Sequence, residues 1–368
     1  MRMKIYLVGG AIRDRLLGRP IHENDWVVVQ SSPEEMIAQG FIPVGKAFPV
    51  FLHPQTKEEY ALARTERKVG PGYHGFTFHT AKEVSLKEDL ARRDLTINAL
   101  AEDDAGNIID YYNGQNDLKQ KVLRHITPAF SEDPVRVLRV ARFAARYANL
   151  GFKVAPETLE LMHQMGIHKE LSYLVAERVW AEWEKALQEP TPGVFFRILE
   201  QAQVLELIFP HFRTPLLENA LTQLDKMALI QPDATLRFAL LMHYLLPAKT
   251  FNKELEEIVT QYKIPNHYYD MASSLQQALA YYLRINFKEP ATIVDLYEAI
   301  DAHRRFARAI PLLQTCALIQ PNSKQKHLEQ AFQTLHTLKP IIPTELKGTA
   351  IADYIRQQRI AAVQNDNY

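Results

Sequence analysis

The spacing of apolar residues changes once along this chain, near residue 130, and that change limits the folds that the chain can adopt. Before it, short β-branched and aromatic runs separated by turn-forming residues predict strands. The predicted strands are residues 4–8, 26–29, 48–52, 59–63 and 108–110. After it, apolar residues recur at helical spacing, as in residues 134–146, 155–165 and 176–187. The sequence therefore predicts an α+β head followed by an all-helical remainder.

Amino-acid composition restricts the class of protein less than the spacing of apolar residues does. The 368 residues are enough for two or three domains. The single cysteine, Cys316, cannot form an intrachain disulfide, which favours a reducing cytoplasm. No apolar run approaches the roughly 20 residues of a membrane span, and no signal peptide is expected at the start of the chain. The 43 basic and 43 acidic residues cancel, so an enzyme of small molecules fits the total charge as well as a nucleic-acid binder does.

Two acidic residues, Glu23 and Asp25, are separated by one residue at the start of a predicted strand. Residues two apart in a strand point the same way, and two adjacent carboxylates repel unless a cation lies between them. Their hard oxygen ligands suit Mg²⁺. A solvated turn is the commoner reading of such a pair, but Gly10 at a nearby helix start lets a phosphate approach the backbone. Arg13, in the first turn of that helix, is placed to contact the same phosphate.

Two further segments concentrate arginine. Residues 92–94 read Arg-Arg-Asp, for which a surface ion pair is the simplest account. Four arginines follow a predicted helix start at steps of three and four: Arg136, Arg139, Arg142 and Arg146. These steps keep them near one helix face. Because no acidic residues are interleaved with them, we expect this face to bind an anionic ligand, for which the planar guanidinium is well suited.

Taken in order, these segments resemble the motifs of class II tRNA nucleotidyltransferases, enzymes with a polymerase-β-like palm. The matching segments are residues 7–14 (LVGGAIRD), 16–18 (LLG), 23–26 (ENDW), 92–100 (RRDLTINAL), 110–114 (DYYNG), 132–136 (EDPVR) and 177–180 (ERVW). Each motif is weak alone, but their shared order argues against coincidence. From about residue 190 onward the resemblance thins.

The resemblance implies that Glu23 and Asp25 hold the catalytic Mg²⁺, although the usual pattern has Asp at both positions. Glu23 keeps the charge and the ligand chemistry and adds one methylene group. Gly10 and Arg13 are implied to contact the nucleotide. Glu59, on a nearby predicted strand, is a candidate third carboxylate.

The resemblance also assigns the nucleotide-binding residues. Arg93 is implied to contact the incoming nucleotide, and Arg139 and Arg142 to support it and its phosphates. Asp133 and Arg136 are implied to act as a protein template that hydrogen-bonds the Watson–Crick edge of CTP or ATP. C and A each carry an exocyclic amine for Asp133, whereas the carbonyl of U would leave it unpaired.

Three other segments receive different expectations. Residues 110–114 and 177–180 are expected to have mainly structural roles. Residues 66–81 have little periodicity, so we expect a mobile loop whose glycine-rich part, residues 70–75, moves when the site changes from C to A.

The implied activity is addition of CCA to the 3′ end of tRNA from CTP and ATP, with release of pyrophosphate. The predicted domains are a nucleotidyltransferase head at 1–128, a helical neck carrying the template motif at 129–190, and a tRNA-binding helical body and tail at 191–368. The predicted partners are tRNA, CTP and ATP, with Mg²⁺ as cofactor and with neither DNA nor a membrane.

Three alternatives stay open: an enzyme that adds only CC or only A, a poly(A) polymerase, and a non-catalytic RNA-binding relative. Some bacterial relatives carry a His-Asp phosphohydrolase domain in the helical part. The matching position here reads His243-Tyr244, and Tyr is a poor replacement for a carboxylate ligand. We therefore expect a short form without phosphohydrolase activity.

Overall fold

The structure, a computed structural model, describes residues 3–21, 23–44, 50–68, 76–79, 82–212 and 215–365. The chain divides into two compact units, Met1–Arg213 and Thr214–Tyr368. The first unit contains every strand of the described residues and the second contains helices alone, which confirms an α+β head followed by helices. The finer division at residues 128 and 190 stays a prediction.

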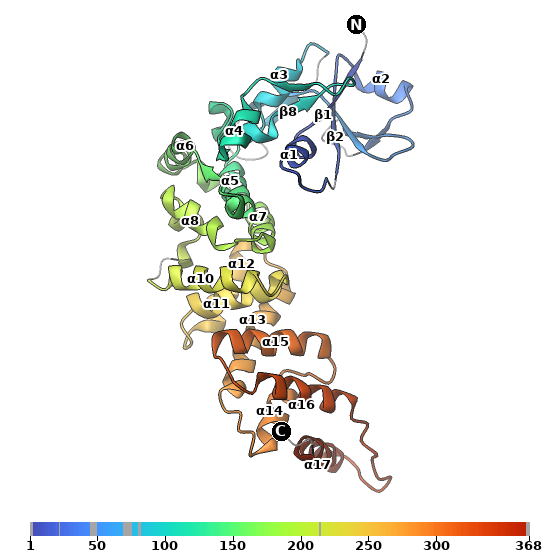
Figure 1. The fold of residues 1–368 in the computed structure, drawn as a ribbon, viewed down its shortest axis with the longest axis vertical. Helices are drawn as coiled ribbons and strands as arrows, with labels where there is room; N and C mark the ends of the chain where they lie inside the picture. The colour runs from blue at the N-terminus through green and yellow to red at the C-terminus, as the bar shows by residue number, and fades with distance from the viewer. Residues whose placement is uncertain are drawn as a thin grey trace. The chain divides into compact units, whose positions relative to one another are not determined.

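The head is built on a seven-stranded sheet with the order β3-β4-β5-β2-β1-β8-β9. Its strands are β1 Lys4–Val8, β2 Asp25–Val29, β3 Ile42–Val44, β4 Val50–Leu52, β5 Glu59–Leu62, β8 Leu100–Glu102 and β9 Ile108–Asp110. Only β2 and β5 pair in parallel among these neighbours. Figure 1 shows β1 between β2 and β8. The register sets Asp25 beside Val8 of β1 and Glu59 of β5.

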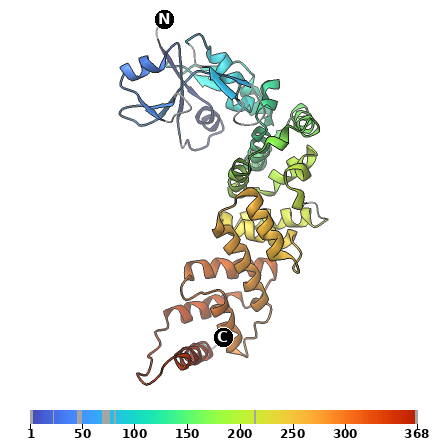
Figure 2. The ribbon, with the colours of Figure 1, turned by 180° about the vertical axis from the view of Figure 1, so that it is seen from behind.

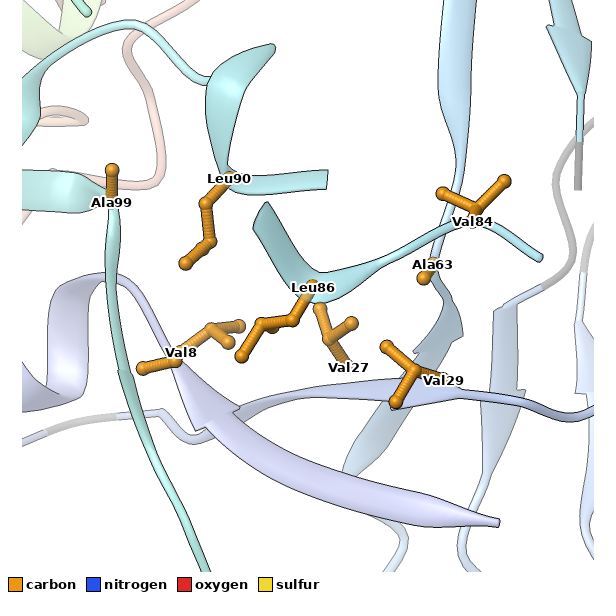
Figure 3. Packing of buried hydrophobic residues seen from close by; sticks show 9 residues of the cluster. Val8, Val27, Val29, Ala63, Val84, Leu86, Leu90 and Ala99 are labelled. Atoms are coloured by element: carbon orange, nitrogen blue, oxygen red, sulfur yellow. The ribbon is translucent and has the colours of Figure 1, made fainter. Parts of the chain in front are cut away.

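Alternation along β2 separates the two faces of the sheet. Val27 and Val29 pack on one face with Leu86 and Leu90 of α3, Leu86–Ala91 (Figure 3). Val28 packs on the other face, in the cluster that includes Met36 of α2, Pro33–Ala38. Asp25 is two residues before Val27, so it belongs to the α3 face. Because α3 ends at Ala91, the chain delivers Arg92 and Arg93 to that same face.

The sequence did not predict β3, β8, α2 or α3. Both helices begin with a capping box, Ser32 with Glu35 and Ser85 with Glu88, which is a readable signal for a helix start. The loop predicted at 66–81 was wrong for its two ends, because β6 (Thr65–Lys68) pairs with β7 (Phe76–His79) as an antiparallel ribbon. Its expected mobile part, residues 70–75, lies outside the described residues.

Besides α2 and α3, the first unit contains α1, which lies between β1 and β2, and the helices that follow β9. They are α1 Gly10–Leu16, α4 Gly114–Gln120, α5 Val135–Tyr147, α6 Pro156–Ile167, α7 Ala176–Gln188, α8 Gly193–Gln201 and α9 Leu205–Ile208. Two short strands, β10 (Val122–Leu123) and β11 (Lys153–Val154), pair in parallel near α5. Trp183 of α7 is fully buried and contacts the rings of Phe196, Phe209 and Phe212 edge-on. This aromatic core fixes α7 relative to α8, and α5 packs on both helices.

The segment at 110–114 anchors the arginine-containing segment that precedes it. The Asp110 carboxylate accepts hydrogen bonds from the backbone N–H groups of Tyr112, Gly114 and Gln115 and so caps the start of α4. Gly114 is buried directly against the backbone of Thr96. These contacts fit the structural role expected for residues 110–114.

Replacing Gly114 with alanine should therefore destabilise the head. A Cβ atom at this position would fall on the carbonyl oxygen of Thr96, which is backbone and cannot rotate away. We expect a loss of about 2 kcal/mol in the free energy of unfolding, measured by urea denaturation. Gln115→Ala, at the next and exposed position, is the matched control and should change stability by less than about 0.5 kcal/mol. Equal effects of the two variants would contradict the steric argument.

The second unit consists of helices. They are α10 Leu217–Ala228, α11 Ala234–Leu245, α12 Phe251–Tyr262, α13 Asn266–Tyr282, α14 Pro290–Ala299, α15 Phe306–Ile319, α16 Gln325–Thr337 and α17 Thr349–Asn365. Helices α11, α13 and α15 pack against one another in the middle of this unit (Figure 2). Cys316 is buried in α15. Within the described ranges, no helix is both long enough and apolar enough to cross a membrane.

Candidate active site

A cavity of about 630 Å³ in the first unit gathers most of the predicted site residues. Its lining comes from the β1–α1 turn, the start of β2, the segment after α3, and helices α5 and α7. The lining residues are Gly9, Gly10, Arg13, Glu23, Asp25, Arg92, Arg93, Asp94, Asn98, Asp133, Arg136, Arg139, Phe143, Arg146 and Arg178. Seven arginines against four acidic residues leave a formal excess of three positive charges (7 − 4). Such a lining suits a polyanionic ligand.

The two carboxylates predicted to hold a metal both reach this cavity. Burial raises the pKa of Asp25, the nearby Arg93 charge opposes that rise, and the Glu23 charge adds to it. Desolvation and the second carboxylate both disfavour the charged form of Asp25, and a divalent cation would offset both effects. Hard oxygen donors are the ligands that Mg²⁺ prefers. The donor set therefore fits a divalent cation.

The glycine turn after β1 makes room for an arginine. Gly9 has a φ of 77°, and a Cβ atom built on it would lie 2.8 Å from Nη1 of Arg93. A side chain at this position would therefore push Arg93 away. Burial lowers the pKa of Arg93, while the charge of Asp89 opposes that shift, and its Nη1 donates to the carbonyl oxygen of Asn98 at 3.4 Å. The turn thus holds a desolvated guanidinium close to Asp25.

Arg13 lines the cavity but is buried, and its guanidinium is held in a polar network. It donates to both carboxylate oxygens of Asp14, at 3.0 and 2.8 Å, and to Oδ1 of Asn98. Asn98 in turn donates to Asp94 at 2.8 Å. Asn98 was not among the predicted site residues, although it belongs to the matching segment 92–100.

Asp94 connects this network to helix α5. It accepts from Asn98 and from the Nε atom of Arg139, the latter at 2.7 Å. Burial alone would raise the pKa of Asp94, but the Arg139 charge and these hydrogen bonds outweigh it and hold that pKa well below its usual value. Asp94 is therefore a fixed anion that orients Arg139 at the edge of the cavity.

Three of the four arginines of α5 are paired with acids from other segments. The ion pairs are Arg139 with Asp94 (2.7 Å), Arg142 with Glu182 (2.6 Å) and Arg146 with Glu189 (2.9 Å). No acid is interleaved with these arginines in the sequence, but the structure supplies acids from the chain before α5, from α7 and from just after α7. The expected binding of an anionic ligand by this face stays a prediction. Arg142 lies outside the cavity lining, buried against Glu182. Arg146, the last arginine of the predicted stripe, lines the cavity, and so does Phe143, which was not predicted.

Asp133, one of the two predicted template residues, is held by three donors. Arg178 donates from Nη1 to Oδ1 at 3.0 Å and from Nη2 to Oδ2 at 2.9 Å. The backbone N–H of Val135 donates to Oδ1 at 3.1 Å. Residues 177–180 were expected to be mainly structural, so the position of Arg178 in the cavity was missed. The sequence held one signal for it, the motif match itself.

Arg136, the second predicted template residue, is fixed by different anchors. Its Nη1 donates to the carbonyl of Ala129 at 2.9 Å, and its Nη2 donates to the carbonyl of Arg92 at 2.5 Å. The side chain is almost fully buried and still lines the cavity. Two hydrogen bonds to backbone carbonyls give Arg136 a defined direction.

Two other predicted features lie elsewhere. Glu59 is exposed and in register with Asp25, and it is absent from the cavity lining as described. His243, in α11 of the second unit, bonds through Nδ1 with the side-chain amide of Gln276 at 2.9 Å, and burial lowers its pKa. The third-carboxylate role and the lack of phosphohydrolase activity both stay predictions.

Comparisons with known proteins show which proteins this chain is similar to. The model of the Poly A polymerase head domain matches residues 5–124, and a model described as the probable RNA and SrmB- binding site of polymerase A matches residues 151–214. The CCA-adding enzyme of Pseudomonas putida (strain W619) is 46% identical over 369 residues, which is 98% of each chain. That of Coxiella burnetii (strain RSA 331) is 44% identical over 366 residues, covering 98% of this chain and 95% of the relative.

Solved structures give the same result. The Bacillus stearothermophilus CCA-adding enzyme in complex with CTP has a TM-score of 0.67 at 27% identity, over 90% of this chain and 77% of that one. The Thermotoga maritima CCA-adding enzyme complexed with tRNA has a TM-score of 0.70 at 22% identity, over 100% and 88%. The second likeness concerns the fold alone. These relatives and structures each match 90% or more of this chain, so the matches include residues of both units.

Proposed function

The chain belongs to the family of CCA-adding enzymes, and we propose that the cavity between β2, α5 and α7 is where it joins nucleotides to tRNA. The protein is a nucleotidyltransferase that adds CCA to the 3′ end of tRNA from CTP and ATP. In each step the terminal 3′-hydroxyl oxygen attacks the α-phosphorus. A new phosphodiester bond forms, the bond to the β-phosphate oxygen breaks, the hydroxyl proton is lost and pyrophosphate leaves.

Glu23 and Asp25 are proposed to hold the divalent metal that this family uses, with Mg²⁺ as the metal. When bound, Mg²⁺ supplies positive charge to the phosphoryl oxygens and to the attacking oxygen. The raised pKa of Asp25 supports the assignment, because this carboxylate is desolvated and near a second one. Asp25 is the first residue of β2, a strand held between β1 and β5, and Glu23 lies two residues before it.

Arginines on the other side of the cavity are proposed to take the nucleotide. Arg93 and Arg139 are anchored by buried acids on one side of their guanidinium groups and reach the cavity lining. Their fixed positions supply charge stabilisation without reorganisation during the reaction. Gly10 lines the cavity at the β1–α1 turn, where a Cβ atom would lie 3.3 Å from Nη2 of Arg13. Arg13 orients Asn98. Arg142 acts behind this layer, through Glu182.

Asp133 and Arg136 are proposed to read the base. Asp133 accepts from the exocyclic amine that C and A share, and Arg136 donates to a ring or carbonyl acceptor. Uracil has a carbonyl where cytosine has the amine, so it would face the Asp133 carboxylate without a hydrogen. The anchored geometry of both residues supports this reading. The helical part from residue 191 is proposed to hold the tRNA, and the single cysteine supports a cytoplasmic location.

The observation that carries the proposal is that motifs from separate segments line one cavity. Its test is incorporation of labelled CTP and ATP into tRNA that lacks its 3′ end, with Mg²⁺. We expect two C residues from CTP alone and a single further A when ATP is present. Use of only one nucleotide would show half of a two-enzyme system, long A tails would show a polymerase, and no incorporation would show a non-catalytic relative.

A further inference from the structure

The Asp133 carboxylate is held in both position and orientation by other residues of the chain. The planar fork of Arg178 holds both of its oxygens, and the start of α5 holds Oδ1 a second time through Val135. Arg178 and Asp133 both line the cavity, with about 29% and 20% of their side chains exposed. Two parallel donations fix the plane of a carboxylate as well as its position.

The pairing leaves room for a base. Each carboxylate oxygen can accept about two hydrogen bonds. Oδ1 accepts from Arg178 and from the Val135 backbone, whereas Oδ2 accepts from Arg178. Oδ2 is therefore the atom with acceptor capacity for an exocyclic amine. Because Arg178 determines the plane of the carboxylate, it determines the direction from which an amine is received.

Arg178 donates to Asp133, and Arg136, the other template residue, has anchors of its own. Arg136 is anchored by the backbone carbonyls of Ala129 and Arg92. Without Arg178, Asp133 would retain the hydrogen bond from Val135 and could turn about its terminal torsion, which is soft for Asp. A carboxylate that can turn tolerates a carbonyl opposite it, because a water molecule can bridge the two acceptors.

We propose that Arg178 is a positioning residue that sets nucleotide choice through Asp133, by holding the carboxylate in the orientation that favours CTP over UTP. The proposal rests on the function proposed above. It predicts that loss of the guanidinium fork changes the ratio of affinities for the two pyrimidine nucleotides. Loss of a merely structural contact would weaken both nucleotides equally.

The test is equilibrium binding of CTP and of UTP, measured by calorimetry on the wild type, Arg178→Gln and Arg178→Lys. We expect the wild-type preference for CTP to shrink by about tenfold in Arg178→Gln. Arg178→Lys keeps the charge and lacks the planar fork, so it should recover the preference only in part. It also keeps the test valid if the glutamine variant folds poorly.

The matched control is Arg124→Gln. Arg124 forms a comparable ion pair with the buried Asp117, with Nε and Oδ2 3.2 Å apart, and lies outside the cavity lining. This control should leave the ratio of CTP to UTP affinity unchanged even if it lowers the melting temperature. Equal ratios in the wild type and both Arg178 variants would overturn the proposal, as would a wild type that binds CTP and UTP equally.

Incorporation assays on the same samples separate this proposal from the function on which it rests. Wild type that adds CCA, with an unchanged affinity ratio in the Arg178 variants, overturns the role of Arg178 alone. Wild type that prefers CTP through Arg178 but adds no nucleotide overturns the proposed site of addition and leaves the role of Arg178 supported.

Discussion

Asp25→Asn should lower the rate of CTP incorporation by about 10³-fold, equivalent to about 4 kcal/mol of transition-state stabilisation. Asparagine keeps the size of Asp25 and removes the charge that a divalent cation needs. The KM for CTP should change little, because the nucleotide contacts proposed for α5 and the segment after α3 remain. The measurement is single-turnover addition of C to tRNA at saturating Mg²⁺.

The folding stability of Asp25→Asn should rise or stay constant. The pKa of Asp25 is raised in the folded protein, so the charged form is disfavoured by folding at pH 7, and a neutral side chain removes that cost. An activity loss accompanied by a lower melting temperature would therefore point to misfolding instead of a lost metal ligand. Asp104→Asn, at an exposed position, is the charge-matched control and should leave the rate within about twofold.

Variants of Glu23 and Glu59 test which other carboxylates bind the metal. Glu23→Asp restores the pattern usual in related enzymes and should retain activity. Glu23→Gln should lower the rate of CTP incorporation, as Asp25→Asn does. Glu59 lies beside Asp25 in the parallel strand, so Glu59→Gln tests for a third ligand. A loss as large as that of Asp25→Asn would assign Glu59 to the metal, and an unchanged rate would leave two carboxylates as the ligand set.

The sequence predicted those parts of the site that are close together in the chain. Gly10, Arg13, Glu23 and Asp25 occupy one strand-turn-helix-strand segment, whose breaks and β-branched runs are local signals. Short strands were missed when they form only through pairing in the sheet. β8 has three residues, Leu100–Glu102, and is a strand because it pairs with β1.

Charge partners could not be predicted, because they depend on packing between distant segments. The four arginines of α5 look uncompensated in the sequence, yet Glu182 is 40 residues from Arg142. Arg178 is likewise 45 residues from Asp133. Since i,i+3 and i,i+4 spacing reports only neighbours on one helix, a second helix that supplies the opposite charge is invisible until the fold is known. The same limit hid the role of Arg178.

Glu182→Gln should destabilise the first unit by about 3 kcal/mol, the largest stability effect that we expect in this chain. Glu182 and Arg142 are both nearly fully buried, with Nε and Oε2 2.6 Å apart. Removing the carboxylate leaves a buried guanidinium beside the more distant Glu189, at 3.6 Å. The melting temperature should fall by about 10 °C. Glu184→Gln, two residues away and less buried, is the control and should cost under about 1 kcal/mol.

The double variant Glu182→Gln/Arg142→Met decides why stability is lost. If the cost is an unpaired buried charge, an apolar side chain of similar length at position 142 should restore at least half of it. Nucleotide incorporation by the folded double variant should match that of the wild type, because Arg142 lies outside the cavity lining and Arg139 keeps its pair with Asp94. Restored stability without restored incorporation would instead show that Arg142 itself contacts the nucleotide, as the sequence motif implies. Additive losses would refute the charge-pairing argument and leave Glu182 as a packing residue.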